Sequence, residues 1–211
     1  MQELIAEPHI KEYYANILSK VTNIHALAND AKKIGVDPEP EAETHPALDL
    51  AERTEKIIKL EGRANRYRTL FEEFKGNRIK VIFKIFEEIL SGDLGNLGDR
   101  SKRLELAIKT ALMLNTEGVV IAPIEGVPKV LISKNFDGTS YVDIYYAGPI
   151  RAAGGTSTVF PLILGDYGRK ILGLDRYKPT EDEIERYCEE TQLYEHIVSR
   201  QYKIKPDEVR K

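Results

Sequence analysis

The segment most informative about the fold is Arg78-Ile-Lys-Val-Ile-Phe-Lys-Ile-Phe-Glu-Glu-Ile-Leu90. Its apolar residues recur at spacings of three and four, the repeat of one face of an α-helix. A helix that is apolar over so much of its surface must be buried on several sides. The sequence therefore predicts that residues 78–90 form the central helix of the core, with a broad buried face of Ile79, Ile82, Phe83, Phe86 and Leu90, widened by Val81, Ile85 and Ile89.

The chain on the N-terminal side is also predicted to be helical. Gly76 separates the central helix from a basic segment at residues 63–75, and Gly62 stops a helix at about 46–61. A first helix of about six turns should end at Gly35. It has one narrow apolar seam, which should pack against a partner helix, either within this chain or in a second copy. The seam consists of Ile10, Tyr14, Ile17, Val21, Ile24, Ala28 and Ala31.

An acidic, proline-rich connector at residues 36–45 should be extended, because two prolines prevent it from being helical throughout. On the C-terminal side of the central helix, residues 91–98 hold three glycines and form a loop. Asp99 or Ser101 then caps a helix that ends near Gly118. Its inward residues are Leu104, Ile108, Ala111 and Leu112.

After residue 118 the pattern changes from helix to strand. Residues 119–124, 129–134 and 141–146 are short and rich in β-branched or alternating apolar residues. The last two of these runs are joined by Asn135-Phe-Asp-Gly138, which predicts an antiparallel hairpin. The fold class is therefore α+β, a helical N-terminal half followed by a small, mainly antiparallel sheet with packed helices.

Two helices are expected to close the chain. The first covers about 156–172, where Pro161 indicates a late start or a bend. The second opens with the capping box Thr180-Glu-Asp-Glu183. Residues 203–211 hold no evident cap or anchor, which is typical of a chain that continues. The second helix should bury Ile184, Tyr187, Cys188, Thr191, Tyr194 and Val198.

These boundaries suggest three regions. Residues 1–117 are a helical region, 118–178 a small α/β region with a glycine-rich loop, and 179–211 a terminal helix with its tail. Cys188 is the only cysteine, which excludes an internal disulfide and a cysteine-based metal cage and suits a reducing, cytoplasmic environment. No signal peptide and no apolar run of membrane-spanning length is evident.

Charge is unevenly distributed, although the net charge is only −3. Residues 63–84 carry seven basic side chains against two acidic ones, and residues 180–195 carry seven acidic ones against Arg186 alone. Such blocks are usually solvated helix faces. The alternative for the basic block is contact with DNA phosphates, for which Arg66 and Lys80 are the candidate residues.

A second candidate site is the stretch Tyr145-Tyr-Ala-Gly-Pro-Ile-Arg-Ala-Ala-Gly-Gly-Thr-Ser157. Its glycines lead from a strand into a helix, where free N–H groups favour an anion. Arg151, Gly154, Gly155 and Thr156 would form a phosphate site. Alternatively, the glycines let helix and sheet touch. No Walker loop, paired carboxylates or Ser/His/Asp set accompanies the loop, so no catalytic residue and no metal or cofactor site is assigned.

The same glycine-rich stretch, together with residues 165–180 and 116–126, resembles the large subunit of archaeal family D DNA polymerase. The resemblance is strong over about 98–202 and weaker over the helical first part, and Pro161 departs from it. It implies a DNA-directed DNA polymerase that works as a heterodimer with a small subunit carrying the 3′–5′ exonuclease. It also implies that the metal-binding aspartates lie far downstream in a double-psi β-barrel. Mg²⁺ would then belong to the full-length enzyme, and this chain would be a non-catalytic N-terminal module for assembly and architecture.

Overall fold

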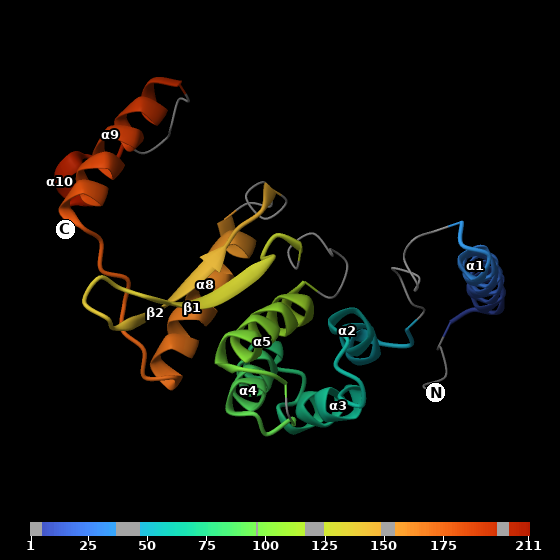
Figure 1. Ribbon diagram of the computed structural model, residues 1–211. Helices are drawn as coiled ribbons and strands as arrows, with labels where there is room; N and C mark the ends of the chain where they lie inside the picture. The colour runs from blue at the N-terminus through green and yellow to red at the C-terminus, as the bar shows by residue number, and fades with distance from the viewer. Residues whose placement is uncertain (1–5, 37–46, 96, 117–124, 149–154, 198–202) are drawn as a thin grey trace.

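The computed structural model describes residues 6–36, 47–95, 97–116, 125–148, 155–197 and 203–211, with only the backbone given for 155–157. The connector at 37–46 and the expected strand at 119–124 lie outside these residues. The described helices and strands confirm an α+β fold (Figure 1). They are α1 (Pro8–Lys33), α2 (Leu50–Ile58), α3 (Ala64–Glu73), α4 (Arg78–Ser91), α5 (Arg100–Asn115), β1 (Lys129–Lys134), β2 (Ser140–Tyr145), α8 (Gly155–Ile171), α9 (Glu181–Ile197) and α10 (Pro206–Val209).

Helix α4 forms where its apolar repeat predicts. The side-chain oxygen of Asn77 accepts a hydrogen bond from the Lys80 N–H at 3.2 Å and caps the first turn. Gly92 follows the helix with a left-handed φ of +89°. Ile79 was predicted to be buried but is 51% exposed, because burial begins only at Val81.

Helix α5, rather than α4, is the centre of the fold, since it contacts α2, α4, α8 and β1. The Asp99 carboxylate caps it by accepting a hydrogen bond from the Lys102 N–H at 2.8 Å. Ser101 does not cap the helix; its hydroxyl accepts a hydrogen bond from the Ile132 N–H of β1 at 3.0 Å. The apolar residues buried along α5 are Leu104, Ala107, Ile108, Ala111, Leu112, Met113 and Leu114.

Strands β1 and β2 form the predicted antiparallel hairpin, with Val130 opposite Ile144 and Ile132 opposite Val142. Gly138 closes the turn with φ of +82°. A two-stranded hairpin is marginally stable by itself in water. Here it packs against α5 and α8, so it depends on the helical core.

Helix α8 begins at Gly155 and contains Pro161, so the expectation of a late start is wrong. Pro161 lies inside α8, where a proline removes one backbone hydrogen bond and its ring crowds the preceding turn, so the packing of this long helix must offset that cost. Two glycines allow α8 to pack closely. A Cβ on Gly165 would lie 2.6 Å from Ile144 Cδ1, and one on Gly168 would lie 2.5 Å from Leu104 Cδ1.

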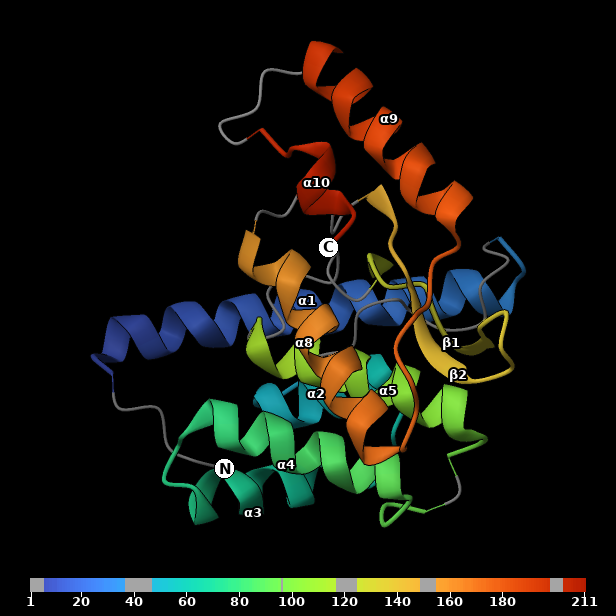
Figure 2. The ribbon, with the colours of Figure 1, turned by 90° about the vertical axis from the view of Figure 1, so that its left-hand side faces the viewer.

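Helices α1 and α9 lie outside the central body formed by α2–α5, the hairpin and α8 (Figures 1 and 2). No residue of α1 is buried, so the expected partner helix is not found in the described part of the chain. In α9 only Cys188 is buried, and the predicted burial of Tyr187 and Tyr194 is wrong. Periodicity identifies an apolar face but does not say whether another element covers it.

The hairpin turn is tied to the segment before α9. The Asn135 side chain donates to the Arg176 carbonyl at 2.8 Å and accepts from the Lys178 N–H at 2.9 Å. The Lys178 ammonium lies 2.6 Å from both Asp137 and Asp175. The hydrogen bond from Lys178, with those from Thr139, lowers the pKa of Asp137 from 3.8 to about 2.

We therefore expect an NMR titration of the Asp137 carboxyl carbon to give a pKa near 2. A lowered pKa means that the Asp137 contribution to stability is complete above pH 3.8 and is lost as the pH falls through about 2. Lys178→Ala should move the Asp137 pKa back towards 3.8, whereas Lys134→Ala, at the other end of the turn, should not. A pKa near 3.8 for Asp137 in the unmodified chain would contradict its ion pair with Lys178.

Gly168→Ala should destabilise the fold, because the added methyl group meets Leu104 and Phe86 in the core. Overpacking costs about 1–3 kcal/mol, while Ala in place of Gly in a helix gains about 0.5–1 kcal/mol, so a net loss of up to about 2.5 kcal/mol is expected. Thermal or urea unfolding measures it. Gly148→Ala is the control, since no described atom lies within 4 Å of the position that its methyl group would take. Equal stability of the two variants would contradict close packing of α8.

Candidate functional site

The glycine-rich loop lies largely outside the described residues, which include neither Arg151 nor Gly154. Gly155 and Thr156 begin α8, and their side chains are not described. The described residues on the two sides of this loop are held close together. The Tyr146 hydroxyl donates to the Thr158 carbonyl at 3.1 Å, and the Ala147 N–H donates to the Gly126 carbonyl at 2.8 Å. An anion site in this loop stays a prediction.

Arg66 of the basic segment is held by carboxylates of its own chain. Its Nε and Nη2 donate to the two oxygens of Glu88 at 3.0 and 2.5 Å, and Nη1 lies 3.3 Å from Glu73. Glu88 is only 7% exposed, on the buried side of α4. The hydrogen bonds to Glu88 raise the pKa of Arg66 further above its usual value. This geometry joins α3 to α4 and uses most of the donors that a phosphate would need.

Two further arginines of the segment also bind within the chain. Arg68 donates through Nε and Nη2 to the Asp49 carboxylate at 2.7 and 3.2 Å. Its hydrogen bond is the main cause of the lowered pKa of Asp49. Arg63 donates to the Leu94 carbonyl in the loop after α4. The arginines of α3 and its cap therefore connect this helix to α2, α4 and the following loop.

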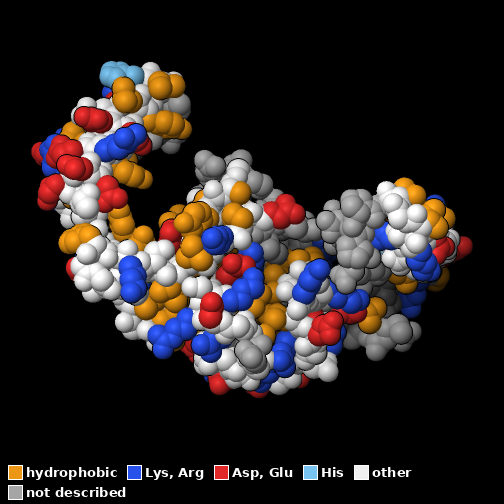
Figure 3. All heavy atoms as spheres, in the orientation of Figure 1, with side chains coloured by type: hydrophobic (Ala, Val, Ile, Leu, Met, Phe, Trp, Pro, Cys, Tyr) orange, Lys and Arg blue, Asp and Glu red, His pale blue; other side chains and the backbone are white. Residues whose placement is uncertain are grey.

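Lysines form the part of the basic segment that remains accessible. The exposed Lys80 side chain has no carboxylate partner among the described residues. Lys84, one turn further along α4, lies 3.9 Å from Glu87 and 4.0 Å from Glu88. Basic and acidic side chains alternate over the visible face of the body instead of forming one stripe (Figure 3). A DNA interface here would have to rely on a few lysines.

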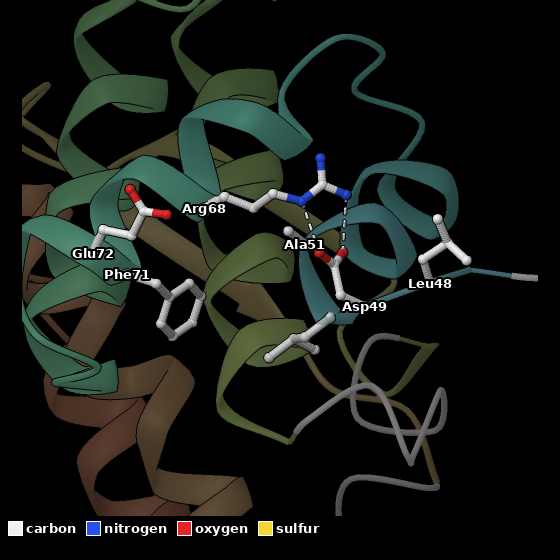
Figure 4. A pocket seen from close by; sticks show the side chains of 7 residues that line it. Leu48, Asp49, Ala51, Arg68, Phe71 and Glu72 are labelled. Atoms are coloured by element: carbon white, nitrogen blue, oxygen red, sulfur yellow. Dashed lines mark hydrogen bonds and ion pairs between the residues drawn. The ribbon is translucent and has the colours of Figure 1, made fainter. Parts of the chain in front are cut away.

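A hollow of about 820 Å³ lies between the start of α2 and the side of α3. The Arg68 guanidinium bonds to Asp49 at one wall, and Phe71 and Glu72 line another part (Figure 4). Sequence reasoning missed this hollow, because Asp49 and Arg68 are 19 residues apart and only the fold pairs them. Since Asp49 neutralises Arg68, the described lining residues present no free cation to an anionic ligand. The same residues include no nucleophile beside a base.

The described residues hold no cluster of metal ligands. No group of three or more His, Cys, Asp or Glu residues among them could bind a metal ion. Within the same parts of the chain, no helix is both long and apolar enough to cross a membrane. The described geometry thus assigns no catalytic role to any side chain.

Comparison with known proteins identifies relatives along the whole chain. The DNA polymerase II large subunit of Methanosarcina barkeri is 41% identical over 210 residues, which is 100% of this chain and 18% of that protein. The protein of the same name from Methanosphaera stadtmanae is 46% identical over 205 residues, 94% of this chain and 18% of its own length. The Thermococcus kodakarensis protein is 42% identical over 213 residues, 100% of this chain and 12% of its own length.

The chain therefore spans less than a fifth of the length of these relatives. Residues 12–211 match the family described as "DNA polymerase II large subunit DP2, N-terminal". These findings confirm the resemblance seen in the sequence and extend it over the helical first part. The chain belongs to the family formed by the N-terminal region of the DNA polymerase II large subunit.

Proposed function

We propose that this chain is a non-catalytic N-terminal module that organises the large, DNA-synthesising subunit of an archaeal replicative DNA polymerase. The family match over residues 12–211 carries the proposal. The small share of the relatives that the chain covers leaves most of a polymerase chain for the catalytic machinery. The module works in the cytoplasm, as part of a DNA-directed DNA polymerase that uses Mg²⁺ bound by downstream residues.

The binding of arginine side chains to groups of the same chain supports an architectural role. Arg63, Arg66 and Arg68 each bind a group on a neighbouring element. Arginine is suited to this because its planar guanidinium bonds a carboxylate through two parallel N–H groups. The basic segment thus fastens α3 in place, which is what a rigid scaffold requires.

The exposed seam of α1 supports a role in assembly. Ile10, Ile17 and Ile24 lie along it and are 36%, 38% and 64% exposed. A seam of this kind is stabilised when a second helix covers it. The proposed partners are the small, exonuclease-bearing subunit of the same polymerase or a second copy of this chain.

Residues 1–211 should show no primer extension and no nuclease activity with Mg²⁺ or Mn²⁺, because the described residues offer no cluster of metal ligands. The assay uses a labelled primer–template and a labelled single strand at high protein concentration. The buffer alone sets the background. Metal-dependent turnover that follows the protein through repeated purification steps would contradict a non-catalytic role.

A second proposal is that the module binds DNA phosphates through residues 63–84 and the Arg151 loop. The exposed lysines of α4 favour it, Lys80 above all. Such binding would weaken steeply with salt, with a slope of about −0.9 per neutralised phosphate. Arg66, held by Glu88, contributes little to it.

Arg66→Ala and Lys80→Ala separate the two proposals. Arg66→Ala should cost about 1–3 kcal/mol of stability, because it leaves the buried Glu88 carboxylate without its closest partner. Lys80→Ala should change stability by less than about 0.5 kcal/mol, as exposed substitutions do. Thermal melts and a low-salt DNA titration are run on both variants and on Arg151→Ala.

If the role is architectural, Arg66→Ala should lower the melting temperature. DNA binding should not change in any of the three variants when each is measured at a temperature at which it is folded. Weaker DNA binding by Lys80→Ala or Arg151→Ala, with an unchanged melting temperature, would favour the DNA interface instead.

A further inference from the structure

Helices α9 and α10 enclose a groove outside the central body, with a volume of about 620 Å³. One wall is the face of α9 that presents Ile184, Tyr187 and Thr191 at helical spacing. The opposite wall consists of Ile204 and Val209 from the last segment of the chain. The volume lies in the range of about 300–1,000 Å³ that is typical of ligand-binding clefts.

Specific contacts hold the two walls together. Arg210 donates from Nε and Nη2 to the two oxygens of Glu185, each at 2.8 Å. On the same side, the buried Cys188 lies with its sulfur 3.7 Å from the Pro206 carbonyl. The Glu208 carboxylate accepts from the Lys205 N–H at 2.8 Å and caps the short α10. The groove is therefore a formed feature and not a gap beside a loose tail.

The floor of the groove is apolar and accessible. Tyr187 is 65% exposed although it lies on the groove face of α9. Tyr177 and Pro179 close one end, and the Tyr177 ring packs against that of Tyr141 at a centroid distance of 5.0 Å. Exposed aromatic side chains on a rigid wall are typical of surfaces that bind a partner.

The charge around the groove indicates the chemistry of the occupant. Helix α9 carries seven carboxylates against Arg186 alone. Glu183, Glu190 and Arg186 line the groove, and Arg186 Nε donates to the Glu190 carboxylate at 3.1 Å. Glu183 has no cationic partner among the described residues, so it gives the groove its uncompensated negative charge. Hydrogen bonds from the Thr180 N–H and the Tyr177 hydroxyl lower the pKa of Glu183. Acidic and apolar side chains lie next to each other on the part of the molecule formed by α9 and α10 (Figure 3). Such a surface repels nucleic acid and attracts cations.

We propose that the groove binds a basic peptide segment of a partner protein. The segment inserts an aromatic or branched aliphatic side chain against Tyr187 and Ile184, and its flanking lysines or arginines lie near Glu183 in the acidic first turn of α9. This proposal goes beyond the assignment to a polymerase and does not depend on it, because it rests only on the apolar walls and acidic rim of this chain.

The test titrates residues 1–211 with three 12-residue peptides that share a central Trp-Leu pair and differ only in flanking Lys, Ser or Glu. Calorimetry and NMR shifts measure binding. The Lys peptide should bind at least tenfold more tightly than the Glu peptide, with the largest shifts at Tyr187 and Val209. Tyr187→Ala should weaken it at least tenfold, since a central aromatic anchor is worth more than about 1.4 kcal/mol, or a factor of ten.

Two matched controls separate the groove from general attraction. Leu193→Ala removes a side chain that is 60% exposed on the same helix but does not line the groove, so binding should not change. Glu190→Gln and Glu189→Gln remove the same charge, but only Glu190 lines the groove. Glu190→Gln should weaken the Lys peptide severalfold, because it also leaves Arg186 of the groove without its carboxylate partner, and Glu189→Gln should not. Circular dichroism confirms that each variant is folded.

Equal effects of Glu189→Gln and Glu190→Gln, or binding that survives Tyr187→Ala, would overturn the proposal in favour of diffuse charge attraction. Absence of binding at millimolar peptide would also overturn it. A dimer of the chain in sedimentation that Tyr187→Ala dissociates would assign the groove to a second copy instead.

Discussion

Helix α5 is buried on nearly every side, and this burial determines how the other elements of the body are placed. Most residues from Leu104 to Leu114 are almost fully buried, although they point in all directions around the helix. Buried apolar side chains on several faces of one helix require other elements to cover each of those faces. Helices α2 and α4, helix α8 and strand β1 do so. The hairpin, too short to be stable alone, is fixed because it is one side of this enclosure.

The elements packed around α5 also position the charged side chains that the fold buries or pairs. Glu105 lies within α5 and is 8% exposed, and it keeps its charge because Lys102 and Lys109 bind it at 2.9 and 3.0 Å. At the outer layer, Arg66 satisfies Glu88 in the same manner. A buried carboxylate without such a partner would be strongly unfavourable. Within residues 63–84, Arg66 meets this requirement for a buried carboxylate, while Arg63 and Arg68 bind a backbone carbonyl and an exposed carboxylate of the same chain.

Local signals in the sequence predicted the elements well. The Asp99 cap, the α4 repeat and the Asn135–Gly138 turn each act over a few residues, so sequence alone identifies them. Features that join distant residues could not be predicted. The pairs Arg66–Glu88 and Arg68–Asp49 form only after folding. Helix α4 was predicted to be central from its apolar repeat, whereas α5 is central through contacts with distant elements that no local pattern shows. For the same reason, nothing local to Arg66 indicated that this candidate for DNA contact is already engaged.

The two helices outside the central body have apolar residues that the core does not need. In α1 the apolar seam runs through 26 residues without one buried side chain, and in α9 only Cys188 is buried. Exposed branched and aromatic residues lower solubility and do nothing for the stability of this core. One helix precedes the body in the chain and one follows it, and only α9 adds a strongly acidic surface. The basic segment that we propose for the α9 groove follows from this acidic surface, whereas the α1 seam requires only a second apolar helix face.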